Sequence, residues 1–460
     1  MALSAALEAL PRIICRTIRK GRFSEYFSSD DVAQVRSYDL DFILRFGFGI
    51  IRGEILESAR YGVWSFHHGD ESRYRGGPPG FWEIYEDSAI CGVILQRLTK
   101  RLDAGVVLRR GYFKTLNYSY SRSLRRMLLE SADWPALVAG EVRRGRDINA
   151  LTPSPSHAPI YRSPSNLKML WFLPKLASNV ARRIFERSVR EEWGVGIARL
   201  SPAEIVAGGR PRGVRWCPRP ANGWMADPMA LVVNGHIHVL CERMRLDADQ
   251  GHIAAITFDG KDWTPEHEAI DAGCHAAYPY MFAFGGEVYC VPETSQANEV
   301  RLYRAIEFPN KWERAGTLVE GVAAVDNTIF EFGSRWWLFF TAADASDHRL
   351  YAFFSSSPFG PWRPHLRNPI KMDVRSSRPA GPPFWFAGSF YRPAQDSSMT
   401  YGGRIAVNRI VELSPAHFEE QTVSHLEPER GRYGRALHTI STAGEFCVID
   451  GKRWRLRGIG

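Results

Sequence analysis

A histidine and an aspartate in the first quarter of the chain, His67 and Asp103, have side chains that could move protons together. An imidazole titrates close to neutral pH, and a neighbouring carboxylate can orient the ring and relay its proton. Taken singly, each residue has a structural alternative. The histidine could bond to the backbone, and the aspartate could cap the turn before Gly105. Together they predict an acid–base site.

Five short motifs between residues 64 and 105 follow one another in an order that resembles the folate-dependent formyltransferase family. They are SFH at 65–67, YRG at 74–76, PGFW at 79–82, GV at 92–93 and LDAG at 102–105. The resemblance implies a Rossmann-like α/β domain that takes 10-formyltetrahydrofolate as its cofactor. It also implies that His67 stabilises the oxyanion of the tetrahedral intermediate, and that Asp103 orients His67 and relays protons.

Two features depart from the family pattern. Ser65 stands where the family has an asparagine, and its hydroxyl is a shorter group for polarising the formyl oxygen, so His68 or an ordered water would have to compensate. The family's first strand–helix units have no counterpart before residue 31. We therefore expect a shortened, partial Rossmann-like domain over residues 1–145. Arg75 could bind a phosphate or carboxylate of the substrate, or could simply be solvated.

From about residue 193 the pattern becomes all-β and repeats. A glycine followed by a short aromatic or aliphatic strand recurs at successive intervals of 51, 47, 55 and 56 residues. A period near 50 with several short strands per unit is typical of propeller blades. Residues 193–460 are therefore predicted to form a five-bladed β-propeller, with WGVGIARL adding the outer strand of the last blade. The repeat glycines are Gly235, Gly286, Gly333, Gly388 and Gly444.

The inner strands of a propeller begin at the mouth of a central channel, so their first polar residues are expected to face one another. Three second-strand positions, seven residues beyond a repeat glycine, add Glu242, Glu293 and Gln395. Carboxylates together with an arginine predict a sugar site, in which Asp227, Glu293, Asp326 and Arg378 bind substrate. We predict no metal site. The five inner-strand residues are Asp227, Tyr278, Asp326, Arg378 and His438.

Residues 190–456 resemble the N-terminal domain of the plant glucosamine inositolphosphorylceramide transferases. The shared motifs are ADP at 226–228, YPYMF at 278–282, GEVYCVPE at 286–293, DNTIFEF at 326–332, WWLFFT at 336–341, SRPAG at 377–381 and YRPAQD at 391–396.

The same region resembles five-bladed glycoside hydrolases of the arabinanase and xylosidase type through Ala226-Asp227-Pro228 and Asp326. Hydrolysis needs two placed carboxyl groups, one of them protonated. Asp227 could be the base, and Asp326 or Glu293 could tune or supply the acid. However, Arg378 occupies the strand start from which the hydrolases' acid comes, so we favour glycan binding over hydrolysis.

Residues 146–192 separate the two predicted domains. The first part, to residue 166, is rich in proline and serine and reads as a linker. Residues 167–190 pair an apolar face with lysines and arginines. A helix that makes peripheral membrane contact has this pattern. A helix packed between domains has it too, and we favour that alternative.

The overall composition limits the kinds of partner that the chain is expected to bind. The net charge of +9, from 59 Lys and Arg against 50 Asp and Glu, suits an anionic partner such as a nucleotide-sugar, or an unspecialised basic surface. No nucleic-acid-binding module is recognisable. Seven scattered cysteines without a CxxC motif favour reduced thiols, a cytoplasmic location and no zinc site.

The sequence thus predicts a formyltransferase-like enzyme that moves a formyl group from 10-formyltetrahydrofolate to an amino sugar or sugar-nucleotide, with a glycan-binding propeller. Two alternatives stay open. One is a glycan-binding or glycoside-hydrolase-like propeller protein that carries an inactive formyltransferase remnant. The other is a scaffold without catalysis.

Overall fold

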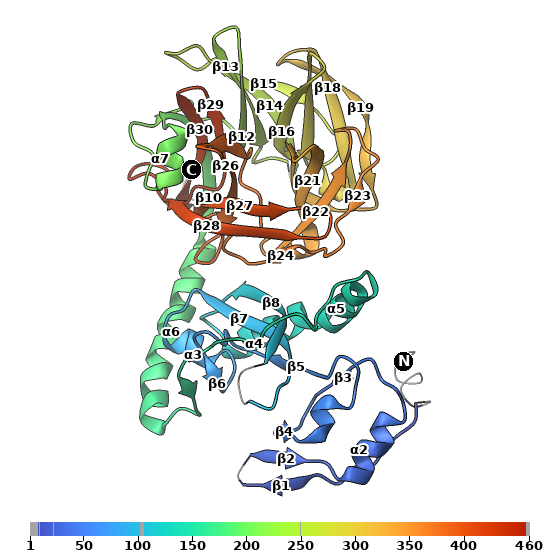
Figure 1. The fold of residues 1–460 in the computed structure, drawn as a ribbon. Coiled ribbons are helices and arrows are strands. Elements are labelled where there is room, and N and C mark those ends of the chain that lie inside the picture. The colour runs from blue at the N-terminus through green and yellow to red at the C-terminus, as the bar shows by residue number, and fades with distance from the viewer. Residues whose placement is uncertain (1–7, 9, 22, 102–104, 249, 457–460) are drawn as a thin grey trace. The chain divides into compact units, whose positions relative to one another are not determined.

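The structure is a computed structural model that describes residues 8, 10–21, 23–101, 105–248 and 250–456. The chain divides into two compact units (Figure 1). The α/β unit comprises Met1–Gly111 and Ser119–Leu170, and the β unit comprises Tyr112–Tyr118 and Trp171–Gly460. The predicted domain boundaries at residues 145 and 192 stay predictions.

The α/β unit contains short strands and helices. Its strands are β1 (Ile18–Lys20), β2 (Ser24–Tyr26), β3 (Ile43–Leu44), β4 (Ile50–Arg52), β5 (Val63–His67), β6 (Arg75–Gly76), β7 (Ile90–Arg97), β8 (Val106–Lys114, which runs on into the β unit) and β9 (Ile160–Tyr161). Its helices are α2 (Ser29–Arg36), the 3-10 helix η1 (Glu54–Glu57), α3 (Phe81–Tyr85), α4 (Tyr120–Ser131) and α5 (Trp134–Arg143).

The main sheet of this unit has the order β3-β5-β7-β8. Strands β3 and β5 pair in parallel, whereas β5 and β7 pair antiparallel, with Trp64 opposite Arg97 and His67 opposite Ile94. The helix between β5 and β7, α3, has only five residues. The sheet therefore mixes both kinds of pairing, and the Rossmann-like part of the prediction is not confirmed.

Local sequence signals explain where the helices of this unit begin. Ser28 and Ser119 accept hydrogen bonds from the amides of Asp31 and Arg122, which caps the first turns of α2 and α4. Trp134 at the start of α5 is fully buried. A smaller core joins η1 to β4 and β5 through Ile51, Leu56 and Val63. The contacts of this smaller core hold the beginning of β5, the strand that ends in His67.

The β unit consists mainly of five antiparallel sheets of four or five strands. Sheet 1 contains β12 (Trp224–Val233), β13 (His236–Met244), β14 (Gly251–Phe258) and β15 (His267–Ile270). Sheet 2 contains β16 (Ala277–Phe284), β17 (Glu287–Glu293), β18 (Glu299–Glu307) and β19 (Lys311–Glu320). Sheet 3 contains β20 (Ala324–Phe332), β21 (Arg335–Ala342), β22 (Arg349–Ser355), β23 (Arg363–Pro364) and β24 (Lys371–Met372).

Sheet 4 contains β25 (Phe384–Phe386), β26 (Ser389–Asp396), β27 (Arg404–Leu413) and β28 (Phe418–Leu426). Sheet 5 contains β29 (Ile440–Ala443), β30 (Phe446–Leu456), β10 (Val189–Arg199) and β11 (Arg215–Trp216). Short helices α7 (Pro202–Ala207), η2 (Ser295–Ala297) and η3 (Ala343–Ala345) lie in the connections, and α6 (Asn166–Ser188) precedes β10.

The predicted repeat corresponds to the first hairpin of each sheet. In sheet 1 the two-residue turn is Asn234-Gly235, where both residues have positive φ, the conformation that a tight hairpin turn requires. The other four repeat glycines occupy the same hairpin turn of sheets 2 to 5.

The predicted closing strand lies in sheet 5. Strand β10 pairs with β30 from Val189 opposite Leu456 to Arg199 opposite Phe446, and so joins the beginning of this unit's main segment to its end. The position within the sheet differs from the prediction, because β11 lies outside β10.

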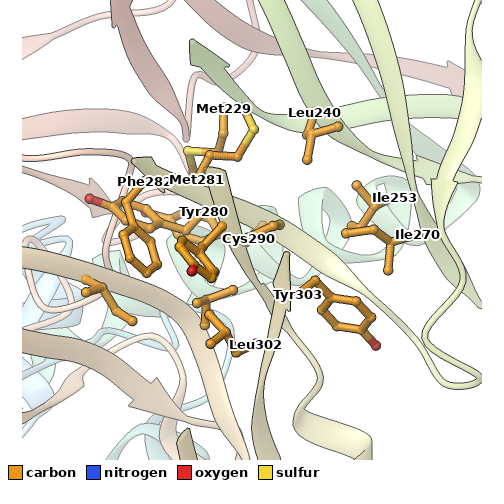
Figure 2. Packing of buried hydrophobic residues seen from close by; sticks show 14 of the residues in the cluster. Met229, Leu240, Ile253, Ile270, Tyr280, Met281, Phe282, Cys290, Leu302 and Tyr303 are labelled. Atoms are coloured by element: carbon orange, nitrogen blue, oxygen red, sulfur yellow. The ribbon is translucent and has the colours of Figure 1, made fainter. Parts of the chain in front are cut away.

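Apolar side chains pack each sheet against the next. One cluster joins Leu240 of sheet 1, Tyr280 of sheet 2 and Phe340 of sheet 3 (Figure 2). Three further clusters join sheets 3 and 4, sheets 4 and 5, and sheets 5 and 1. The unit is therefore mostly β, with five sheets in a cyclic order of packing. This order agrees with a five-bladed propeller-type fold.

Of the described residues, no helix combines the length and the apolar character needed to cross a membrane.

Candidate functional site

Three of the five predicted inner-strand residues share an unusual backbone conformation. Asp227, Tyr278 and Asp326 have φ values of 51°, 43° and 55° in β12, β16 and β20. The strand register shifts at each of these places. A residue with a side chain in the left-handed region costs on the order of 1–2 kcal/mol. The same strain repeated in three sheets marks a place where the chain orients polar groups.

Asp326 is the centre of the polar contacts at this place. Its Oδ2 accepts from Arg378 Nε at 2.5 Å and from Gln395 Nε2 at 2.8 Å, while its Oδ1 accepts from Arg378 Nη2 at 3.3 Å. Its amide lies 3.4 Å from Glu293 Oε2. The Asp326 side chain is 1% exposed. The structure thus brings together three of the predicted substrate-binding residues, Glu293, Asp326 and Arg378.

Burial changes the protonation of these groups. Burial acts to lower the pKa of Arg378, but the Asp326 carboxylate outweighs it and holds that pKa well above its ordinary value. Burial, reinforced by the charge of Asp326, raises the pKa of Glu293 to about 7. Burial and the charge of Asp227 raise the pKa of Glu242 well above its ordinary value. The cluster therefore contains carboxyl groups that carry a proton at neutral pH.

Asp227 belongs to a second part of the cluster, around His438. Thr439 Oγ1 donates to Asp227 Oδ1 at 2.8 Å, and His438 Nε2 lies 3.4 Å from the same oxygen. Burial raises the pKa of Asp227 to about 6, while the charge of His438 opposes that rise. The other ring nitrogen of His438, Nδ1, forms a short ion pair with Asp450 Oδ2.

The charge of His438 follows from these two carboxylates. Burial lowers its pKa, but Asp450 and Asp227 outweigh burial and raise that pKa above its usual value. The ring stacks on Trp193 with centroids 3.9 Å apart. These two carboxylates therefore favour the imidazolium form of His438.

Asp227, His438 and Asp450 are also the described residues that could hold a metal ion, since one ligand atom from each lies within 4.8 Å of the others. Asp450, however, already accepts hydrogen bonds from the amides of Asp227, His438 and Thr439. These bonds occupy the lone pairs that a cation would use. The donor set fits a protonated histidine better than a divalent ion.

Two further buried residues at equivalent strand positions, Thr341 and Lys452, are not among the sequence predictions. In the second strand of sheets 1, 2 and 4, the sixth residue after the first paired residue is Glu242, Glu293 and Gln395, respectively. The equivalent position holds Thr341 in sheet 3 and Lys452 in sheet 5. Counting from the glycines missed these two, because Gly333 and Gly444 are the first rather than the second residue of their turns.

Lys452 is fully buried, and its Nζ contacts Glu191 Oε1 at 2.9 Å and the Tyr401 carbonyl at 2.9 Å. Burial lowers its pKa. The Tyr401 ring also lies against Arg378, with the guanidinium carbon 5.2 Å from the ring centroid.

In the α/β unit, Ser65 and His67 border a cavity of about 150 Å³. Arg45 Nη1 donates to Ser65 Oγ at 2.9 Å, and His67 Nε2 lies 3.0 Å from the Tyr74 carbonyl oxygen. A carbonyl only accepts, so Nε2 carries the proton and Nδ1 remains an acceptor in the neutral ring. Arg45, Arg52, Gln96, Arg101 and Gly105 also line the cavity.

The other predicted residues of this unit are Asp103 and Arg75, and the sequence also names His68. Asp103 falls outside the described residues, between Arg101 and Gly105. Arg75 does not line the cavity; its Nη1 donates to the Ala158 carbonyl at 3.1 Å, beside the pairing of β6 with β9. Burial and the neighbouring His67 lower the pKa of His68 to about 4. His68 is therefore neutral at physiological pH.

Comparison with solved structures gives a family 117 glycoside hydrolase from Zobellia galactanivorans at 13% identity and a TM-score of 0.37, covering 50% of this chain and 84% of that one. A methionyl-tRNA formyltransferase of Prochlorococcus marinus subsp. pastoris is 31% identical over 118 residues, which is 25% of this chain and 36% of the relative.

Plant proteins match a longer part of the chain. Glucosamine inositolphosphorylceramide transferase 1 of Oryza sativa subsp. japonica is 30% identical over 300 residues, covering 57% of this chain and 40% of the relative. The protein of that name from Arabidopsis thaliana is 35% identical over 258 residues, covering 51% and 33%. The chain thus spans less than half the length of these relatives. Residues 217–439, which include Asp227, Asp326 and Arg378, match the family model described as glucosamine inositolphosphorylceramide transferase 1, N-terminal.

Proposed function

We propose that the chain is a carbohydrate-directed transferase whose β unit binds an amino sugar at a cluster of polar residues. This central cluster comprises Asp227, Glu242, Glu293, Asp326, Arg378, His438 and Asp450. The observation that carries the proposal is the shared left-handed backbone of Asp227, Tyr278 and Asp326, since three sheets accept strain to orient polar groups. The plant relatives bear the name of a glucosamine transferase, which supports the same class of sugar.

The charges of the cluster favour an ammonium group as the ligand. Five carboxyl groups, on Asp227, Glu242, Glu293, Asp326 and Asp450, stand against the cations of Arg378 and His438, whose partners are Asp326, Asp227 and Asp450. An incoming ammonium would let Glu293 and Glu242 release their protons and pair with it. Because Arg378 already binds Asp326, a sulfate, phosphate or uronate is a poorer ligand for this cluster.

Titration calorimetry tests this site with glucosamine, N-acetylglucosamine and glucuronate. We expect glucosamine to bind most tightly, with protons released on binding. Asp227→Asn, which keeps the acceptor for Thr439 but removes a charge, should weaken binding about tenfold, as loss of a charged hydrogen bond does. The exposed Asp262→Asn serves as the control. Equal binding of the three sugars, or an Asp227→Asn protein indistinguishable from the control, would refute the proposal.

For the α/β unit we propose formyl transfer from 10-formyltetrahydrofolate to the amine of that sugar. The cavity lined by Ser65, His67 and Gly105 supports it. When bound, the cofactor supplies the formyl group. His67 Nδ1 would take a proton from the attacking amine, and Arg45 or Gln96 could donate to the oxyanion. His67 would then return the proton to the nitrogen that the formyl group leaves.

A stable folate analogue and a transfer assay test this second site. We expect the wild type and His67→Ala to bind the analogue, and His67→Ala to transfer formyl groups about 100-fold more slowly. Asp103→Asn should also slow transfer. His157→Ala, an exposed histidine of the same unit, is the matched control. If the wild type fails to bind the analogue, the α/β unit is an inactive remnant and only the sugar-binding proposal survives.

One observation favours glycoside hydrolysis as a second candidate for the β unit. Burial raises the pKa of Glu293 to about 7, so this carboxyl group can carry a proton near neutral pH, and it lies next to the Asp326–Arg378 ion pair. Hydrolysis needs such an acid and a second, ionised carboxylate. Turnover of aryl glycosides that is lost in both Glu293→Gln and Asp227→Asn would support it. The same turnover in either variant as in the wild type would exclude that residue.

We propose the cytoplasm as the compartment of the protein.

A further inference from the structure

Helix α6 (Asn166–Ser188) carries a wide apolar face that is exposed along its length. At the helical period, Leu170, Leu173 and Ile184 lie at the centre of this face, and Leu167, Trp171 and Phe185 lie along one side of it. Each is more than half exposed. Water-soluble monomers rarely leave so many large apolar side chains in one continuous stripe.

The opposite side of the helix already has partners. Phe172 is buried, Asn179 Nδ2 donates to the Asn117 carbonyl at 3.1 Å, and the Arg183 guanidinium lies 5.5 Å from the Tyr118 ring centroid. The helix is thus held by one side. On the other side Phe185 contacts Trp454, with ring centroids 6.4 Å apart, and the rest of the apolar face is exposed and can receive an occupant.

Charge decides what that occupant is. Lys168, Lys175, Arg182, Arg183 and Arg187 stand on the helix against one carboxylate, Glu186. Lys175 and Arg182 border one edge of the apolar face, and Arg187 borders the other. Long cationic side chains beside an apolar stripe are suited to anionic lipid headgroups, since the stripe enters the acyl region while the cations stay at the phosphates.

We propose that α6 docks the protein on an anionic membrane surface, lying parallel to it with the face of Leu170, Leu173 and Ile184 inserted. Docking requires neither the sugar site nor the formyl-transfer site.

Vesicle co-sedimentation of the full chain tests the proposal. We expect binding to vesicles of phosphatidylcholine with phosphatidylserine, much weaker binding to phosphatidylcholine alone, and a decrease with added salt. Ile184→Ser should lower the partition coefficient about tenfold, and the double variant Leu170→Ser, Ile184→Ser should lower it further. Arg182→Glu with Arg187→Glu should abolish the preference for phosphatidylserine.

Ile306→Ser is the matched control, because Ile306 and Ile184 are both 64% exposed. The proposal is overturned if Ile184→Ser and Ile306→Ser bind vesicles equally, or if the wild type does not bind. Light scattering without vesicles tests the main competing explanation, in which the apolar face is a dimer interface. A dimer that Ile184→Ser dissociates, with no vesicle binding, would assign the face to a second copy of the chain.

Discussion

Arg378→Met should lower the free energy of unfolding by about 3–5 kcal/mol at pH 7, because it leaves buried carboxylates without their cation. Arg378 donates twice to Asp326, and its side chain is only 12% exposed. Glu293 lies beside the same pair. A loss of this size approaches the whole stability margin of many domains. Denaturant unfolding followed by tryptophan fluorescence measures it.

The loss in the free energy of unfolding caused by Arg378→Met should grow with pH. Burial and the charge of Asp326 raise the pKa of Glu293, and Arg378 opposes that rise. Without the guanidinium the pKa of Glu293 rises further above its unfolded value, so the stabilising contribution of Glu293 is complete only below the unfolded value and disappears as pH rises. The deficit against the wild type should therefore be small near pH 4 and widen toward pH 8. Arg378→Lys, which retains the charge without the forked geometry, should lose less.

Arg335→Met, at an exposed position of β21, is the control for removing an arginine. Adding Asp326→Asn to Arg378→Met should recover part of the loss, since the unpaired charge is then gone. If Arg378→Met is as stable as Arg335→Met across this pH range, the central ion pair does not stabilise the β unit and the site as described is wrong.

His438→Gln should cost about 3 kcal/mol near pH 6 and less at higher pH. The two carboxylates raise the folded-state pKa of His438 above its ordinary value of 6.5. The contribution of such a group is complete below the unfolded pKa and is lost as pH rises through the folded pKa. The difference in stability between wild type and variant should thus shrink as pH rises above 6.5.

Unfolding curves at a series of pH values measure this difference, and NMR titration of the imidazole checks the raised pKa directly. His236→Gln, an exposed histidine of the β unit, should show little pH-dependent difference. A His438→Gln deficit that grows as pH rises would mean that the ring is neutral, and the pairing with Asp227 and Asp450 would be contradicted.

The sequence alone determined the repeat of the β unit and the types of residue at its centre. Hairpin turns depend on local chemistry, so the glycine of Asn234-Gly235 and its four counterparts could be read directly. The inner-strand residues followed from the same period. The sequence predicts Asp227, Asp326, Arg378 and His438 as the first polar residues of inner strands. The structure places Arg378 and His438 before β25 and β29 rather than within them, and joins the four residues into two ion-pair groups.

Only the tertiary structure decided which of these groups pair and which are protonated. The pairing of Arg378 with Asp326 links positions 52 residues apart, and the Asp450 partner of His438 comes from the second strand of its hairpin. Pairings of this kind depend on how whole sheets pack, which no local pattern encodes. The raised pKa values of Glu242 and Glu293 depend on burial, and burial is a property of the assembled core.

In the α/β unit, the division between what the sequence determined and what only the tertiary structure decided is sharper. The sequence motif put Ser65 and His67 two positions apart, and the structure places both on β5. The sequence could not show that the Tyr74 carbonyl accepts a hydrogen bond from His67 Nε2, that Arg75 donates to the Ala158 carbonyl, or that β7 runs antiparallel to β5. Strand direction and side-chain partners are set by contacts between segments distant in the chain, so motif order alone did not determine the sheet.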